Sequence, residues 1–225
     1  MLFAIDIDRT IAGGFKAYIE HHNQDLELGI HPEVLDALTG YQSFLHLPEV
    51  IAYRRINEAR FQESRASCRI SPQVIRSLEE IPGAVKGVTY LSQFGTIRYY
   101  TIRSPEVQEG TREWLSTKRF PNPDDVVFCE SSLHKLSTLY PQETHEAIVL
   151  IDDKCESLLR AFEKIARESP HVAEDLQRCL VIVVFGLEAL SLPADCKGLK
   201  VLALPSWDAV ADVIAPLCLN AESTS

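Results

Sequence analysis

The chain lacks a hydrophobic run long enough to cross a membrane. Its longest apolar stretch, at 180–185, is far shorter than the ~20 residues that a membrane-spanning helix requires. The N-terminus also lacks the basic region of a secretory signal, and Asp6 interrupts the apolar run that opens the chain. We therefore expect a soluble, cytoplasmic protein with no membrane partner.

Positive charge is scarce as well. The 225 residues contain 22 Lys and Arg against 32 Asp and Glu, which gives a formal net charge of −10 with neutral histidines. An acidic surface repels nucleic acids and anionic lipids, so we expect neither as a partner. The overall charge leaves the local charge of a substrate pocket open, and it carries no information on the oligomeric state.

The cysteines form no C-x-x-C pair and have no zinc-like spacing with histidine. Most of them stand in apolar surroundings, which is typical of small buried residues. We interpret all six as reduced thiols of a cytosolic protein. They are Cys68, Cys129, Cys155, Cys179, Cys196 and Cys218.

From residue 81 onward, short apolar runs alternate with helical patterns. This alternation predicts a parallel sheet covered by helices on both faces, which is a three-layer α/β fold of the doubly wound type. The expected strands are the opening apolar run 2–5 and the segments 96–101, 126–129, 147–151, 180–185 and 199–204. Expected helices include 84–94, one that begins at Ser104-Pro105, one with Leu158 and Phe162 on its apolar face, and one capped by Ser206.

The segment 15–80 differs from the rest because it contains helix signals but no strand-like run. Pro32 and Ser71-Pro72 each stand at an expected helix start. We therefore assign 1–14 and 81–225 to the sheet-containing core domain, and 15–80 to a small helical insertion that closes over the first strand.

Two details of the insertion bear on its surface. Five arginines between 48 and 69 could form a basic face for an anionic substrate, but we favour a helix with pairs such as Arg54–Glu58 four residues apart. The pair His21-His22 has no ligand spacing, and we interpret it as exposed and in a loop.

Acidic residues follow the first predicted strand directly. Asp6 and Asp8, with Thr10 two residues later, give the pattern D-x-D-x-T. Two carboxylates so close repel each other unless a cation or a proton compensates them. The pattern therefore indicates a divalent metal, with one aspartate free to act as a nucleophile.

Further polar residues follow the next expected strands. Thr101 ends the second one, Lys135 lies shortly after the third, and Asp152 with Asp153 ends the fourth. Because the carboxyl ends of parallel strands meet at one edge of a sheet, we expect these side chains to converge with the first motif.

With these four motifs the sequence resembles the haloacid dehalogenase (HAD) superfamily of phosphatases and phosphotransferases. The resemblance implies a Rossmannoid core with a cap domain inserted between the first and second motifs. It also implies Asp6 as the nucleophile that forms an aspartyl-phosphate, Asp8 as general acid and base, and Thr101 and Lys135 as groups that hold the phosphoryl oxygens.

The same resemblance implies Mg²⁺ as the cofactor. Its ligands would be Asp6, the backbone carbonyl of Asp8, and Asp152, while Asp153 would orient a metal-bound water or Lys135.

Contacts to the substrate are expected from Thr10, Arg9, Ile102 and Arg103. Arg9 departs from the family pattern, in which glycine is most common at this position. A bulky residue is tolerable at this position if its backbone φ is negative, and the Arg9 side chain could contact either the substrate or the cap. Arg103 could reach a substrate anion or form a salt bridge.

The sequence therefore predicts a Mg²⁺-dependent phosphohydrolase of a small phosphorylated substrate. A degenerate relative that binds phosphate ligands without turnover is an alternative. A metal-independent haloacid dehalogenase is disfavoured because its chemistry needs neither Asp8 nor the Asp152-Asp153 pair. A phospho-receiver module is disfavoured because its acidic pair precedes the phosphoacceptor strand. Nothing in 15–80 identifies the substrate.

Overall fold

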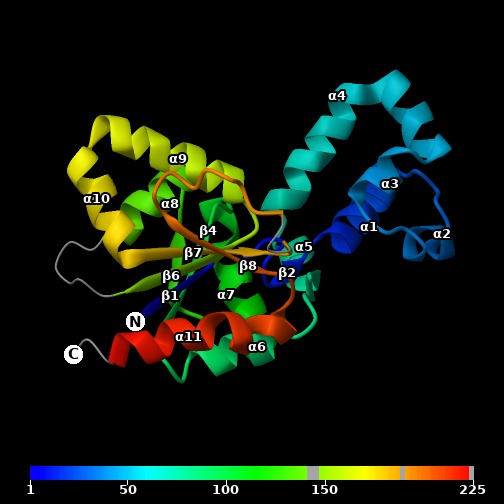
Figure 1. The fold of residues 1–225 in the computed structure, drawn as a ribbon. Coiled ribbons are helices and arrows are strands. Elements are labelled where there is room, and N and C mark those ends of the chain that lie inside the picture. The colour runs from blue at the N-terminus through cyan, green and yellow to red at the C-terminus, as the bar shows by residue number, and fades with distance from the viewer. Residues whose placement is uncertain (141–146, 188–190, 223–225) are drawn as a thin grey trace.

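Among the residues that the computed structural model describes (1–140, 147–187 and 191–222), six strands form one parallel sheet at the centre of the molecule (Figure 1). The strands are β1 (Leu2–Ile5), β4 (Thr96–Thr101), β5 (Val126–Phe128), β6 (Ile148–Asp152), β7 (Leu180–Phe185) and β8 (Lys200–Leu204). Their order is β5-β4-β1-β6-β7-β8, with every neighbouring pair parallel. Each predicted strand is present, and its bounds lie within one residue of the expected ones.

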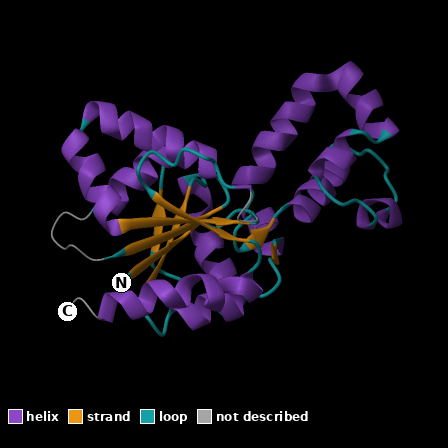
Figure 2. Ribbon diagram, viewed as in Figure 1, coloured by secondary structure: helices purple, strands orange, loops and turns teal. Residues whose placement is uncertain are grey.

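Helices cover both faces of this sheet (Figure 2). One face packs against α6 (Ala84–Leu91), α7 (Gln108–Thr117) and α11 (Val210–Glu222), and the other against α8 (Ser132–Leu139), α9 (Cys155–Glu168) and α10 (Pro170–Cys179). Phe3 and Ile5 join the first layer and Ala4 joins the second, since successive side chains of a strand point to opposite faces. The three-layer α/β architecture predicted from the sequence is thus confirmed.

Two helices of the second layer, α8 and α10, were not predicted. In α8 the leucines at 136 and 139 are buried, but Lys135 is buried as well. A lysine on the buried face removes the amphipathic pattern by which a helix is recognised. At the C-terminal end, Ser206 precedes a short 3₁₀ turn, η3 (Trp207–Ala209), that leads into α11, but its side chain does not cap the turn.

The segment 15–80 contains five helices. They are α1 (Phe15–Asp25), α2 (Pro32–Asp36), α3 (Tyr41–Leu45), α4 (Pro48–Ile70) and α5 (Pro72–Ser77). The first four stand out from the sheet (Figure 1) and share an apolar cluster of their own, which includes Ile19, Phe44 and Phe61. We call α1–α4 the cap helices.

α5 lies against the core instead. Its Arg76 pairs with Glu113 of α7, and the Trp114 indole of α7 donates a hydrogen bond to the Leu78 carbonyl at 2.8 Å. Ser71 caps this helix, as Ser71-Pro72 predicted, by accepting a hydrogen bond from the Val74 amide.

A short antiparallel ribbon, which was not predicted, connects the cap helices to the core. It pairs β2 (Ala12–Gly13) with β3 (Glu79–Glu80). The segment that leads into the cap helices and the segment that follows α5 therefore lie side by side. Strands of two residues carry no periodic pattern that a sequence could reveal.

The interpretation of His21-His22 as an exposed loop pair is wrong. Both residues lie in α1, and the His22 side chain is buried, with its ring stacked between Phe44 and Phe61. The His22 ring is hydrogen-bonded to Ser64 and to Tyr41 at 2.9 Å each. Burial lowers the pKa of His22 to about 4.

The expected pairing on α4 is present, since Arg54 Nε donates to Glu58 Oε2 at 2.8 Å. The six cysteines, all within the described residues, form no disulfide. In the part of the chain that the structure describes, no helix combines the length and the apolar character that crossing a bilayer requires.

Candidate active site

A tight turn follows β1 and carries the D-x-D-x-T motif. The Ile7 carbonyl accepts hydrogen bonds from the amides of residues 10–12 at 2.9–3.3 Å, so the chain turns tightly as it leaves the sheet. The C-terminal part of the chain supports this turn, because the buried Trp207 indole donates to the Thr10 carbonyl at 2.7 Å. Gly87 allows this approach, since a Cβ there would lie 2.4 Å from the Trp207 ring.

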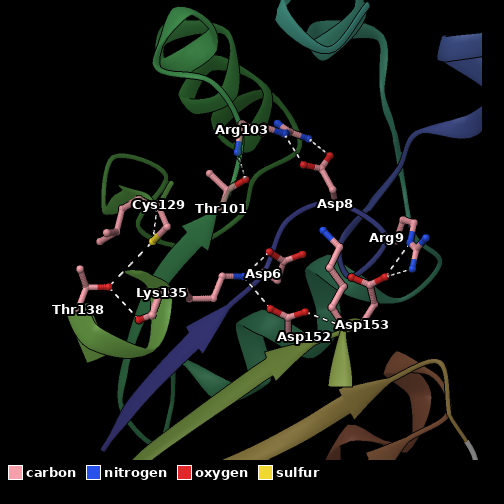
Figure 3. A network of polar contacts seen from close by, with 12 residues as sticks. Asp6, Asp8, Arg9, Thr101, Arg103, Cys129, Lys135, Thr138, Asp152 and Asp153 are labelled. Atoms are coloured by element: carbon pink, nitrogen blue, oxygen red, sulfur yellow. Dashed lines mark hydrogen bonds and ion pairs between the residues drawn. The ribbon is translucent and has the colours of Figure 1, made fainter. Parts of the chain in front are cut away.

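Lys135 joins the first and fourth motifs (Figure 3). Its Nζ donates to Asp6 Oδ1 and to Asp152 Oδ2 at 2.6 Å each, and all three side chains are buried. Burial disfavours the Lys135 ammonium, but the two carboxylates outweigh burial and raise the pKa of Lys135. Burial also raises the pKa of Asp6 to about 7, against the opposing effect of Lys135. The predicted convergence of Asp6, Lys135 and Asp152 is therefore present.

Asp8 is held by Arg103 (Figure 3). The guanidinium donates from Nε to Asp8 Oδ2 at 2.9 Å and from Nη2 to Asp8 Oδ1 at 2.7 Å, and its Nη1 donates to Thr111 Oγ1 at 3.2 Å. The Arg103 side chain is only 4% exposed, whereas Asp8 is 33% exposed. Burial tends to raise the pKa of Asp8, but Arg103 outweighs it, and the pKa of Asp8 lies below its usual value. Of the two roles expected for Arg103, the structure shows the salt bridge.

Among the described residues, the hydrogen bonds and the ion pair of the Arg9 side chain go to Asp153 and not to the cap helices. Both its Nε, at 2.7 Å, and its Nη2 donate to Asp153 Oδ2 (Figure 3). The condition of a negative φ is not met: Arg9 has φ of 65°, in the left-handed region where a Cβ clashes with the backbone. A left-handed conformation favours glycine, which agrees with glycine being most common at this position in the motif that the sequence resembles. The expected contact of Asp153 with Lys135 is absent among the described hydrogen bonds, in which Asp153 pairs with Arg9.

Three carboxylates could hold a metal ion together. Asp6, Asp152 and Asp153 each offer an oxygen, and these oxygens lie within 4.8 Å of one another. Two buried oxygens, Asp6 Oδ2 and Asp153 Oδ1, have no hydrogen-bond partner among the described residues. An all-oxygen donor set with unpartnered buried oxygens fits a hard divalent cation such as Mg²⁺. The Asp8 carboxylate lies outside this cluster, which is consistent with the expectation that only its backbone carbonyl would serve.

The remaining expected site residues lie around these groups. Thr101 is buried at the end of β4, and its hydroxyl accepts a hydrogen bond from the Arg103 amide at 3.3 Å. The Thr10 hydroxyl is buried and lacks a partner within the described structure. Ile102 is 37% exposed, so it is accessible to a ligand.

Sequence reasoning missed two residues that bear on the site. Burial raises the pKa of Asp153 and Arg103 lowers that of Asp8, and in both cases the charge of Lys154 acts in the lowering direction, so its ammonium lies near both carboxylates. Tyr18 of α1 brings the cap helices to the site: burial raises its pKa to about 12, and the charge of Asp8 adds to that effect. The sequence signal for Lys154 was its position directly after the Asp152-Asp153 pair, whereas Tyr18 carried none.

No protein-family model matches the chain, and no curated protein matches it. Solved structures match it over nearly the whole length. A HAD family hydrolase of Deinococcus radiodurans, solved with bound phosphate and sodium, is 13% identical, with a TM-score of 0.54 over 97% of this chain and 95% of that one. The HAD hydrolase YfnB of Bacillus subtilis, solved with magnesium, is 11% identical, with a TM-score of 0.53 over 94% and 96%.

A third similar structure is a 2-haloacid dehalogenase of Pseudomonas syringae, 12% identical, with a TM-score of 0.51 over 96% of this chain and 98% of that one. At this level of identity the matches define the fold. The chain has the fold of HAD-superfamily hydrolases, as the motif resemblance implied.

Proposed function

We propose that this protein is a metal-dependent phosphohydrolase that cleaves a small phosphomonoester through an aspartyl-phosphate on Asp6. The observation that carries the proposal is the state of the Asp6 carboxylate. One oxygen is anchored by Lys135 at 2.6 Å, while the other is buried and has no partner among the described residues. A buried carboxylate oxygen without a partner can bind a ligand from outside the chain, which suits a nucleophile beside a metal site.

In the first step, an Asp6 oxygen forms a bond to phosphorus and the ester P–O bond breaks. The leaving oxygen takes a proton from the Asp8 carboxyl group. In the second step, water attacks the same phosphorus and Asp8 takes back a proton, so inorganic phosphate leaves and Asp6 is restored. A Mg²⁺ ion bound by Asp6, Asp152, Asp153 and the Asp8 carbonyl would offset the charge of the transferring phosphoryl group.

Lys135 and Thr101 support both steps. The Lys135 ammonium keeps Asp6 oriented and offsets negative charge that develops on phosphoryl oxygens, and the Thr101 hydroxyl can donate to one of them. Arg103 keeps Asp8 ionised, which suits the attack of water but opposes the first step. We therefore expect the Arg103–Asp8 pair to loosen when a substrate binds.

The test is hydrolysis of a panel of phosphomonoesters, including p-nitrophenyl phosphate, with Mg²⁺ or with a chelator. We expect Mg²⁺-dependent phosphate release that falls by about 10³-fold or more in Asp6→Asn and in Asp8→Asn. Asp124→Asn, which changes an exposed aspartate outside the site, is the matched control. Undiminished turnover in Asp6→Asn would show that Asp6 is not the nucleophile.

Two ion pairs favour a second candidate, a protein that binds phosphate ligands without turnover. Arg103 holds the acid–base candidate Asp8, and Arg9 holds the metal-ligand candidate Asp153. Binding of Mg²⁺ and inorganic phosphate with no hydrolysis across the panel would support this candidate. Halide release from 2-haloacids without metal would instead indicate a dehalogenase.

A further inference from the structure

A cavity of about 550 Å³ opens beside the candidate active site, and no step of the proposed reaction uses it. Arg9 and Asp153 form the side nearest the metal-ligand cluster, and the first turn of α9 forms another side. Phe185 and Leu187 add an apolar wall. This volume is typical of a pocket for a small organic ligand, so the cavity can hold the part of a substrate beyond the phosphoryl group.

The lining of this cavity is cationic in a chain of net charge −10. Arg9, Lys154 and Arg160 line it, against two acidic residues, Asp153 and Glu156. A local excess of positive charge on an acidic protein attracts an anionic group and orients its approach.

Much of this positive charge is available to a ligand. Lys154 makes no side-chain ion pair with any residue that the structure describes, and it is exposed. Arg160 pairs with Glu156 at 3.9 Å, but their side chains are 69% and 82% exposed, so the pair is weak. Arg9 uses Nε and Nη2 for Asp153, and its side chain remains 72% exposed. A ligand anion therefore meets three cations, none of which is buried in an ion pair.

The backbone at Arg9 adds to this argument. A φ of 65° disfavours every residue with a Cβ, and glycine would avoid the cost. Position 9 is nevertheless occupied by an arginine, whose side chain both pairs with the metal-ligand candidate Asp153 and lines the cavity. A guanidinium at this point can contact a substrate on both sides of its phosphoester bond.

We infer that the substrate carries a second anionic group, a carboxylate or a second phosphate, which binds in this cavity beside Arg9, Lys154 and Arg160. The inference rests on the proposed phosphohydrolase function and defines its substrate class. A short hydrocarbon linker along Phe185 and Leu187 would join the two anionic ends. The substrate class is thus an ω-carboxyalkyl phosphate or an α,ω-bisphosphate.

The test compares matched esters in the full-length protein with Mg²⁺. Alkyl phosphates are set against ω-carboxyalkyl phosphates and α,ω-alkanediol bisphosphates, each with linkers of two to five carbons. We expect at least one dianionic series to exceed its alkyl match by about tenfold or more in kcat/KM, as a charge-assisted contact implies. The two series distinguish a carboxylate from a phosphate.

Two arginines of α9 provide a matched pair of variants. Arg160→Gln should lower the preference ratio about tenfold, whereas Arg167→Gln, at the exposed last turn of α9 outside the cavity, should leave the ratio unchanged. A ratio near one for every linker, or a ratio that Arg160→Gln does not change, would overturn the inference.

Calorimetric binding of the same esters to Asp6→Asn separates this inference from the proposed function. If alkyl phosphates are hydrolysed as well as the esters that carry a second anion, the result would support the proposed function and overturn the cavity assignment. An Arg160-dependent binding preference, with no ester hydrolysed by the wild-type protein, would support the cavity assignment and overturn the function.

Discussion

Arg103 and Asp8 form a two-pronged ion pair that joins the second motif to the first, with contacts of 2.9 and 2.7 Å. The guanidinium is almost fully buried and has a third partner in Thr111 of α7. The structure thus has a fixed protein cation on the carboxylate to which we assign proton transfer. In the D-x-D-x-T motif, the first aspartate is held by Lys135 and the second by Arg103.

Replacing Arg103 should destabilise the fold, because Asp8 loses its counterion and Thr111 loses a hydrogen-bond donor. We expect Arg103→Gln to lower the free energy of unfolding by about 2 kcal/mol, less than for a fully buried pair because Asp8 is one-third exposed. Urea denaturation measures the change. Arg98→Gln removes the partly exposed Arg98–Asp125 pair and should cost less than about 1 kcal/mol. An equal cost for both variants would contradict this prediction.

The backbone at Arg9 predicts an unusual ranking of substitutions. Arg9→Gly should be more stable than Arg9→Ala by about 1 kcal/mol, since only glycine adopts the left-handed conformation without strain. Thermal unfolding of both variants measures the difference. Arg119 has φ of 64° outside the site, so Arg119→Gly and Arg119→Ala should show the same ranking.

The same two pairs of variants test the competition between Arg9 and a metal. Both Arg9 variants should bind Mg²⁺ more tightly than the wild-type protein, because Asp153 loses its guanidinium partner. Neither Arg119 variant should change Mg²⁺ affinity, which titration calorimetry measures. Weaker Mg²⁺ binding in Arg9→Gly would instead mean that Arg9 supports the metal site.

Metal binding should stabilise the protein through Asp6, Asp152 and Asp153. At 100 times its dissociation constant, Mg²⁺ should add about 2.7 kcal/mol to the free energy of unfolding, and a chelator should remove that gain. Asp153→Asn should reduce the gain, whereas Asp124→Asn should preserve it. Differential scanning calorimetry with and without Mg²⁺ measures both. A gain of the same size in Asp153→Asn would remove Asp153 from the ligand set.

His22 predicts how the cap helices respond to acid. Its pKa is about 4 in the fold and about 6.5 in the unfolded chain, so between these values the unfolded chain binds more protons. The stability from the neutral ring is therefore complete above pH 6.5 and is lost as the pH falls toward 4. We expect a loss of about 2 kcal/mol between pH 7.5 and pH 5.

Denaturation of His22→Gln at both pH values measures the His22 contribution. The variant should lack this part of the pH dependence, while His31→Gln, which changes an exposed histidine beyond α1, should retain it. A pH dependence in His22→Gln equal to that of the wild-type protein would show that the ring is not buried in its neutral form.

The positions of the sheet strands and of most core helices along the chain could be predicted from local sequence patterns. The strands β1, β6 and β7 are short apolar runs whose side chains are mostly buried on both faces, and such runs are visible in the sequence without any knowledge of their neighbours. Because parallel strands bring their carboxyl ends together, the meeting of Asp6, Lys135 and Asp152 could also be predicted.

What a polar side chain contacts was decided only by the tertiary structure. The helix α8 could not be recognised from the sequence, because its buried face carries the charged residue Lys135. Burial of this charge is possible because two carboxylates, Asp6 after β1 and Asp152 in β6, neutralise it. His22 is buried because aromatic rings and hydroxyls from two other helices, α3 and α4, surround it. Neither set of partners is adjacent in sequence, so no periodic pattern records them.

The sequence by itself determined the α/β core and the set of residues that meet at the end of β1. Only the tertiary structure showed that Arg103 holds Asp8, that Arg9 holds Asp153 with a left-handed backbone, and that a cationic cavity lies beside them. The reason is physical. An apolar periodicity repeats along a helix or strand, so a short stretch of sequence is enough to recognise it. An ion pair or a cavity depends instead on single side chains that distant segments bring within a few ångströms of one another.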